Sequence, residues 1–255
     1  MKPTHRVAAV AAALVLATGL GVSSAIAQEP QAPPAAPSQE QADQLLEKAL
    51  QSIEAGNPQT AIDQFLDPLI VDFERMVTLE GPQLYSANTM GEAILYSALN
   101  AAVARKGETP RDATVLGGAW SSALHLKGYA LIDLERYEEA KATLRHGLEI
   151  APMNPALWNE LGAILQLEMN WPEALHAYEQ GESNAGLFQG PDRKRVNPLL
   201  TRALRGQGYV LIETGELKKA EKIYKRCLKL DPNDALAQKE LVFIADLRKQ
   251  RKAGK

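Results

Sequence analysis

Side chains suited to catalysis or metal binding are scarce in this sequence, which has four histidines and one cysteine. His125, His146 and His176 lie far apart, and no two of them have the i, i+4 spacing of a helical metal site. Cys227 has no second cysteine to pair with, so it cannot form a disulfide within the chain. The sequence therefore predicts no metal, no cofactor and no enzyme; an enzyme of an unrecognised kind remains a third hypothesis behind two binding roles.

Glycine patterns of nucleotide binding also lack their context. Gly206-Gln207-Gly208 lies in a helical pattern, without the preceding strand that a dinucleotide-binding turn requires. No G-x-x-x-x-G-K-[ST] run occurs. Cys227 stands where a packed helix needs a small apolar residue, which predicts a buried and inert thiol.

The first 27 residues have the pattern of a secretory signal. A short basic segment that includes Lys2 and Arg6 precedes the apolar stretch Val7 to Gly21, and Ala25-Ile26-Ala27 follows as a small-residue cleavage site. The apolar stretch is shorter than the ~20 residues of a spanning helix, so an uncleaved anchor is the weaker alternative. We expect cleavage after Ala27, a periplasmic or secreted protein, and no membrane insertion after cleavage.

Composition describes the rest of the chain. Residues 28–39 are rich in Pro, Ala and Gln, which predicts an extended linker. Beyond them, few aromatic residues and abundant Ala, Leu, Glu and Lys favour helices. Residues 28–104 carry 11 acidic and 2 basic side chains, whereas residues 217–255 carry 12 basic and 5 acidic ones. This asymmetry indicates either solvated faces or electrostatic steering of a charged partner. Because we expect an exported protein and its net charge is negative, nucleic acid is not expected as a partner.

A repeated spacing organises the second half of the sequence. Gly128, Gly162 and Gly208 are followed at one common separation by Ala140, Ala174 and Ala220, and then, one helical turn further on, by Leu144, Tyr178 and Tyr224. Gly128 and Gly162 stand one period apart, roughly 34 positions, which is typical of stacked helical hairpins. Gly208 follows after one further period plus an insertion of a dozen positions within 184–200. Gly and Ala at these positions allow the two helices of a hairpin to approach closely.

Trp158-x-x-Leu161-Gly162, followed by Ala174-x-x-x-Tyr178, resembles the tetratricopeptide repeat family. The resemblance implies an all-α fold, a right-handed superhelical solenoid of helix-turn-helix repeats. We expect an array over 114–254, with repeats at about 121–154, 155–188 and 201–234. Leu165 replaces the tyrosine of the family pattern, and Gly186 replaces its closing proline.

The remaining elements are predicted from local signals. Residues 40–113 form a degenerate helical repeat region, with a hairpin over 39–76, a helix over 89–105 and then a loop. Asn57, Asn154 and Asn197 each precede a proline, and we expect each side chain to cap a helix start. Residues 235–251 form a capping helix with a polar outer face, which a solenoid needs for solubility.

By resemblance to the family, the first helix of each repeat lines a concave groove. The partner-binding residues expected there are His125, Tyr129, Asn159, Gln166, Arg202, Arg205 and Tyr209. They combine aromatic anchors with hydrogen-bonding groups, and the two arginines could hold a carboxylate. The set differs from the clamp of relatives that hold chaperone tails, because Tyr129 and Glu160 stand where that clamp has asparagines.

The leading hypothesis is a protein–protein interaction module that binds a peptide or protein of the cell envelope in this groove. The alternative is a structural protein that self-associates head to tail, with its acidic end against the basic end of the next copy. The inserted segment within 184–200 is either part of the binding face or a plain connector. Ordinary solvated residues on the groove helices also remain an open interpretation.

Overall fold

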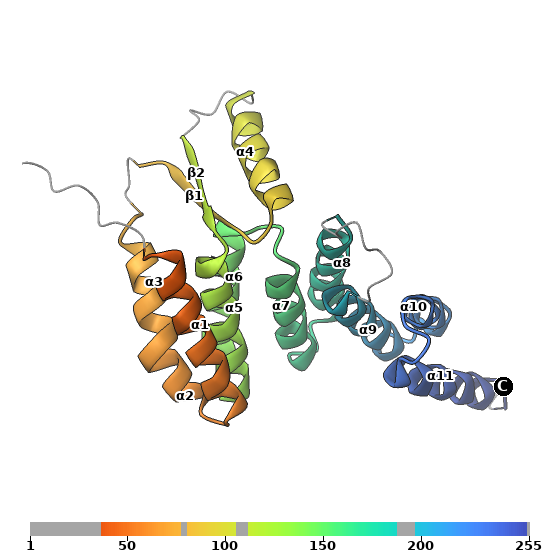
Figure 1. Ribbon diagram of the computed structural model, residues 1–255. Coiled ribbons are helices and arrows are strands. Elements are labelled where there is room, and N and C mark those ends of the chain that lie inside the picture. The colour runs from red at the N-terminus through yellow and green to blue at the C-terminus, as the bar shows by residue number, and fades with distance from the viewer. Residues whose placement is uncertain (1–36, 78–80, 106–111, 188–196, 254–255) are drawn as a thin grey trace, which may run out of the picture. The chain divides into compact units, whose positions relative to one another are not determined.

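The arrangement of the helices follows from a computed structural model, which describes residues 37–77, 81–105, 112–187 and 197–253 (Figure 1). The expected signal segment, most of the linker and most of the 184–200 insertion lie outside the described residues. The elements in chain order are α1 (Gln39–Glu54), α2 (Pro58–Ala61), the π-helix η1 (Ile62–Leu66), α3 (Asp67–Glu74), β1 (Gln83–Ala87), α4 (Met90–Arg105), β2 (Ala113–Gly117), α5 (Ala119–Asp133), α6 (Tyr137–Ile150), α7 (Pro155–Leu167), α8 (Trp171–Leu187), α9 (Pro198–Glu213), α10 (Leu217–Leu230) and α11 (Ala235–Ala253).

Consecutive helices pair as antiparallel hairpins, α5 with α6, α7 with α8, and α9 with α10. Glycine makes these pairs possible: a Cβ on Gly128 would lie 2.5 Å from a Leu144 methyl group, and one on Gly162 would lie 2.9 Å from the Tyr178 ring. Only glycine leaves room at these contacts. The structure confirms the predicted all-α solenoid of helical hairpins, to which two short strands are added.

The N-terminal hairpin consists of α1 against α2, η1 and α3, and it packs on α5. The Ser38 hydroxyl accepts a hydrogen bond from the Gln41 amide at 3.2 Å and so caps α1. The second arm widens into η1 immediately before Pro68, which has no N–H to donate to a regular helical bond. Phe73 then stacks on Trp120 of α5, with ring centroids 5.8 Å apart.

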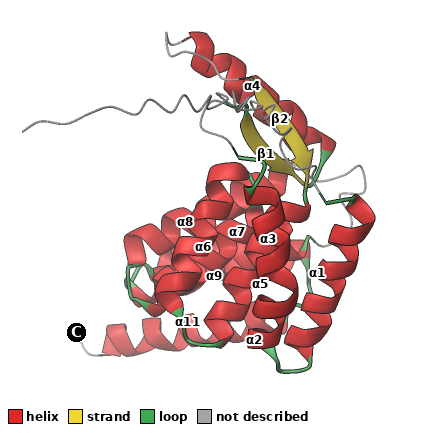
Figure 2. Ribbon diagram, turned by 90° about the vertical axis from the view of Figure 1, so that its left-hand side faces the viewer, coloured by secondary structure: helices red, strands yellow, loops and turns green. Residues whose placement is uncertain are grey.

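The two strands, β1 and β2, were not predicted from the sequence. They pair in parallel, with Gln83 opposite Ala113, and α4 is the crossover between them (Figure 2). Tyr85 of β1 stacks on Tyr96 of α4, and the Tyr96 hydroxyl accepts a hydrogen bond from the Met153 amide at 3.2 Å. The β1–α4–β2 unit is therefore attached to the turn between α6 and α7.

Two of the three predicted asparagine caps are present. Asn154 Oδ1 accepts from the Ala156 amide at 2.9 Å, and Asn197 Oδ1 accepts from the Leu199 amide at 3.0 Å. The prediction is wrong for Asn57. Its side chain bonds the carbonyl of Ala55 instead, because its backbone has a φ of −116° and a ψ of 57° rather than the extended cap conformation.

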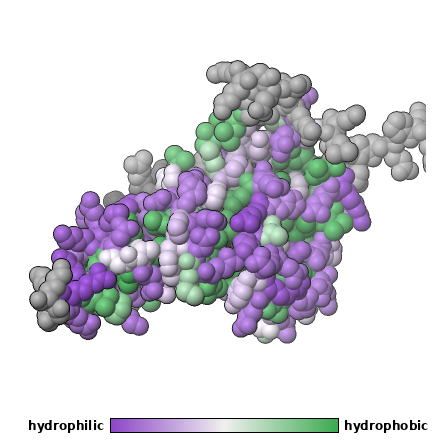
Figure 3. All heavy atoms as spheres, turned by 180° about the vertical axis from the view of Figure 1, so that it is seen from behind, coloured by the Kyte–Doolittle hydropathy of each residue, from purple (hydrophilic) through white to green (hydrophobic). Residues whose placement is uncertain are grey.

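The outer face of the last helix, α11, is only partly polar, whereas the sequence analysis expected a polar one. Val242 and Phe243 are 64% and 49% exposed, and the polar residues Lys239 and Asp246 are exposed on the same helix. Seen from behind, the surface is mostly hydrophilic, with separate hydrophobic patches (Figure 3). None of the described helices is both long and apolar enough to cross a membrane.

Candidate functional site

The centre of the candidate site is a buried carboxylate. Glu160 of α7 is 2% exposed. One of its oxygens lies 2.6 Å from Nη2 of Arg202 on α9, and the other lies 3.4 Å from Nε2 of His125 on α5. Three first helices of successive hairpins thus contribute one side chain each to a single cluster, which we call the Glu160 cluster.

The charge of Glu160 is stabilised by this cluster. Burial by itself raises the pKa of the Glu160 carboxyl, but the hydrogen bond from His125 and the positive charge of Arg202 outweigh burial, and the net shift is downward. The ionised form is therefore the favoured form in the folded protein. Arg202 was predicted to bind the carboxylate of a partner, and in the structure it already holds one from its own chain.

Arg205, one turn further along α9, has a similar partner. Its Nε lies 2.9 Å from Oδ2 of Asp234, a buried side chain at the start of α11. The other oxygen of Asp234 accepts from the Ala237 amide at 3.0 Å and so caps α11. Asp234 thus positions the arginine and starts the last helix at the same time.

A concave hollow of about 280 Å³ lies over α7, α9 and α11. Its lining includes Gln166, Arg202, Arg205, Tyr209, Leu236 and Glu240, and we call it the central groove. Burial raises the pKa of Tyr178 to about 12, and its hydroxyl donates to Oε1 of Gln166 at 3.0 Å. Tyr209 packs beside Trp171 and remains more than one third exposed.

Four of the seven predicted groove residues line the central groove: Gln166, Arg202, Arg205 and Tyr209. Asn159 does not reach a surface. It is fully buried, and its Nδ2 donates to the Leu199 carbonyl at 3.0 Å, which holds the start of α9 against α7. Tyr129 is exposed on α5, outside the lining of the central groove.

The seventh residue, His125, lines a different hollow of about 280 Å³ beyond the Glu160 cluster. Polar side chains from several helices and their ends surround it, among them Asn88, Ser122, His125, Asn154, Asn184 and Asn197. We call it the polar hollow. It lies where the β1–α4–β2 unit meets the repeats, so the sequence analysis, which did not predict that unit, missed it.

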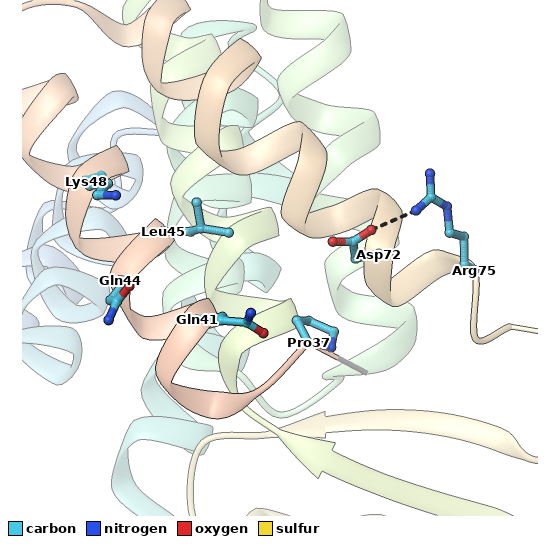
Figure 4. Close-up of a pocket in the computed structure, with 7 residues that line it drawn as sticks. All are labelled: Pro37, Gln41, Gln44, Leu45, Lys48, Asp72 and Arg75. Carbon is cyan, nitrogen blue, oxygen red and sulfur yellow. Dashed lines mark hydrogen bonds and ion pairs between the residues drawn. The ribbon is translucent and has the colours of Figure 1, made fainter. Parts of the chain in front are cut away.

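A third hollow, of about 400 Å³, lies between α1 and α3 (Figure 4). Pro37 and Leu45 supply apolar surface, and Asp72 pairs with Arg75 at 2.9 Å on its rim. This ion pair is exposed, so it contributes little to stability and provides no buried polar group for a ligand.

The described residues hold no group of three or more His, Cys, Asp and Glu side chains suited to a metal ion. His146 lies edge-on to Trp120, and His176 lies edge-on to Trp158. Cys227 is buried, and burial raises the pKa of its thiol to about 11, as the prediction of an inert thiol requires.

Sequence reasoning missed the partners of both arginines. Asp234 had a usable signal, because it stands directly before a helix at the repeat position that Asn154 occupies in the first repeat. Glu160 had no comparable signal. Whether a carboxylate on a groove helix is exposed or buried depends on the side chains that the neighbouring helices bring to it.

Comparisons with known proteins agree on the repeats. Models of the tetratricopeptide repeat match residues 121–154 and 201–234, which cover most of α5–α6 and α9–α10. No curated protein matches the chain.

Several solved structures are similar in fold. A kinesin light chain-type protein of Podosopora anserina with nearly identical TPR-like repeats is 13% identical, with a TM-score of 0.55, over 85% of this chain and 92% of that one. A MamA double mutant from RS-1 is 16% identical, with a TM-score of 0.51, over 86% and 90% of the two chains. The first TPR of Spaghetti (RPAP3), bound to the HSP90 peptide SRMEEVD, is 22% identical over 51% and 95%, with a TM-score of 0.44. The first two likenesses support a solenoid of tetratricopeptide-type hairpins.

Proposed function

We propose that this protein is an interaction module that binds an extended peptide segment of a partner protein in the central groove. The supporting observation is the way the groove is built. Arg202 and Arg205 are each held by a buried carboxylate from a neighbouring helix, and they lie beside the exposed ring of Tyr209. Polar donors in fixed positions next to an aromatic surface are typical of peptide recognition.

The pairing of the arginines changes the expected partner chemistry. Each guanidinium has five N–H donors, and the ion pairs with Glu160 and Asp234 use only some of them. The paired carboxylates also offset the positive charges. We therefore propose that the remaining donors bind backbone carbonyl groups of the peptide, whereas the sequence analysis had assigned them to a carboxylate.

A photo-reactive residue tests where the partner binds. Placed at Tyr209 it should crosslink a partner in cells, whereas at Leu167, an exposed residue outside the groove lining, it should not. With the crosslinked partner identified, Tyr209→Ala should weaken its affinity by about tenfold, as expected of an aromatic anchor. Crosslinking at Leu167 alone, or an unchanged affinity of the Tyr209→Ala variant, would contradict the groove assignment.

We also propose that the protein acts outside the cytoplasm, in the periplasm or beyond. The support is the sequence of residues 1–27, with its basic start, apolar stretch and Ala25-Ile26-Ala27 site. N-terminal sequencing of the protein purified from its native cells should begin at Gln28. A full-length chain in the cytoplasmic fraction would contradict this proposal.

Self-association is the second candidate, and the exposed apolar residues of α11 favour it. Val242 and Phe243 lie on a helix rich in Lys and Arg, whereas α1 at the other end of the described chain is acidic. A head-to-tail contact would bring these opposite charges together. Sedimentation should then show oligomers at low salt that dissociate at high salt or in the Phe243→Ser variant. A monomer under all these conditions would eliminate the candidate.

A further inference from the structure

The polar hollow differs from the central groove in the helix ends that surround it. Its lining includes residues at or near the starts of α4, α5, α7 and α9, represented by Thr89, Ser122, Asn154 and Asn197. In Figure 1, the strands lie above α5 and α6, and α4 lies next to the strands. Helix N-termini carry partial positive charge, which favours an anion near them. The first amides of α7 and α9 are already bonded to the side chains of Asn154 and Asn197, so side-chain amides are the donors that remain for a ligand.

Two buried amides give a second and independent indication of a ligand. Asn184 is 6% exposed, lines the hollow, and makes no side-chain hydrogen bond to any other described residue. Asn154 is 5% exposed, and its Oδ1 is occupied by the Ala156 and Leu157 amides. Its amino group has no acceptor within the described part of the chain. Buried polar groups are nearly always paired with protein, water or ligand, so these amides are available to a bound group with acceptor atoms.

The acidic side chains near the hollow are already occupied. Glu92 is buried, its Oε2 accepts from the Asn88 amide at 2.7 Å, and burial raises the pKa of its carboxyl, which favours the uncharged form. Glu160 is paired with Arg202 and His125. Among the described helices, α8 alone has its C-terminal end at the hollow. The Ala185 carbonyl at that end accepts a hydrogen bond from Asn197 Nδ2 at 3.1 Å. The amino groups of Asn154 and Asn184 therefore remain as donors in the lining.

We propose that the polar hollow binds a small oxyanion of the carboxylate class, which accepts hydrogen bonds from the Asn154 and Asn184 amides. The carboxylate is that of a free small acid or the C-terminal carboxylate of a peptide. Because the Glu160 cluster separates the hollow from the central groove, this site does not depend on peptide binding in that groove.

Titration of the mature chain with acetate at constant ionic strength tests the site, and inorganic phosphate serves as a second probe. The readout is the NMR signals of the Asn side-chain amides. We expect saturable shifts of the Asn184 and Asn154 signals. A peptide with a free C-terminus and the same peptide with an amidated C-terminus distinguish the two sources: binding of only the former assigns a peptide terminus, and binding of acetate alone assigns a small acid. Saturation by none of these probes would overturn the proposal.

Two variants of Asn184 sharpen the test. Asn184→Leu removes the donor and should weaken acetate binding by about tenfold or more. Asn184→Asp places a carboxylate in the hollow and should abolish binding. Because the hollow favours an anion, the stability of this variant relative to the natural protein should be no lower at pH 7 than at pH 3. Asn57→Asp, at another helix start, is the matched control and should bind as the natural protein does. Undiminished binding in both Asn184 variants, or a loss of stability of the Asn184→Asp variant relative to the natural protein as the pH rises, would contradict the assignment.

Discussion

The central groove and the polar hollow lie on either side of Glu160, and they use polar side chains in opposite ways. In the groove, Arg202 and Arg205 are tied to buried carboxylates of other helices. In the hollow, the amides of Asn154 and Asn184 have hydrogen-bonding capacity that the described residues do not use. The polar groups of the groove therefore stabilise the fold as well as line the proposed peptide site, whereas the spare groups of the hollow are available to the proposed ligand.

The largest effect on stability should come from Arg202→Ala. This change leaves the buried Glu160 with His125 as its remaining ion-pair partner, and it should lower the free energy of unfolding by about 2 kcal/mol. Urea denaturation measures the change. Arg226→Ala, which removes an exposed pair with Glu182, is the control and should cost less than about 1 kcal/mol. Equal losses in the two variants would show that the Glu160 cluster contributes no special stability.

The stabilising contribution of the Glu160 cluster should also depend on pH. The folded protein lowers the pKa of Glu160, so its contribution is fully present above the unfolded value near 4.5 and is lost as the pH falls through the folded pKa. The difference in unfolding free energy between the natural protein and Glu160→Gln should be constant near neutral pH. It should shrink below about pH 4.5. A difference that does not vary down to pH 3 would contradict the assigned pairing.

Asp234→Ala should have the next largest effect, about 1–2 kcal/mol, because it removes both the cap of α11 and the partner of Arg205. Asp234→Asn should cost less, since an asparagine can still cap the helix. A double-mutant cycle with Arg205→Ala separates the ion pair from the cap. A coupling energy of zero would mean that Asp234 acts through its cap alone.

The smallest effects should be found in the polar hollow. Asn154→Ala removes a cap and should cost about 1 kcal/mol. Asn184→Ala should change stability by less than about 0.5 kcal/mol in the absence of ligand, because the structure shows no hydrogen bond that it would break. Thermal denaturation of the two variants side by side measures the contrast. A larger loss for Asn184→Ala would mean that its amide is a structural group.

The repeats were predictable because each of their contacts repeats at a fixed sequence separation. Gly128 faces Leu144, and Gly162 faces Tyr178 at the same separation along the chain, so one spacing identifies both contacts. The β1–α4–β2 unit has no such signal. Its strands are short, and the whole of α4 separates the paired Gln83 and Ala113. Neither strand segment contains a sequence signal that shows with which other segment it pairs.

The candidate site also contains both predictable and unpredictable features, as the residues at one repeat position show. His125, Asn159 and Arg205 occupy equivalent places on α5, α7 and α9, so the sequence assigned all three to the groove. In the structure His125 contacts Glu160, Asn159 is buried beneath the start of α9, and Arg205 pairs with Asp234. The periodicity of the sequence predicts on which face of its helix a residue lies. Whether its side chain is exposed depends on which residues of the adjacent hairpin pack over that face.

The helical hairpins and the order in which they stack could be predicted from the sequence alone, because they depend on local spacing and on the small size of Gly and Ala. Which polar residues are free depends on the tertiary structure. Glu160 and Asp234 come from helices other than α9, and their positions against Arg202 and Arg205 depend on the packing of several hairpins at once. A buried charge is stabilised by its neighbours in space, and those neighbours are not adjacent in the sequence.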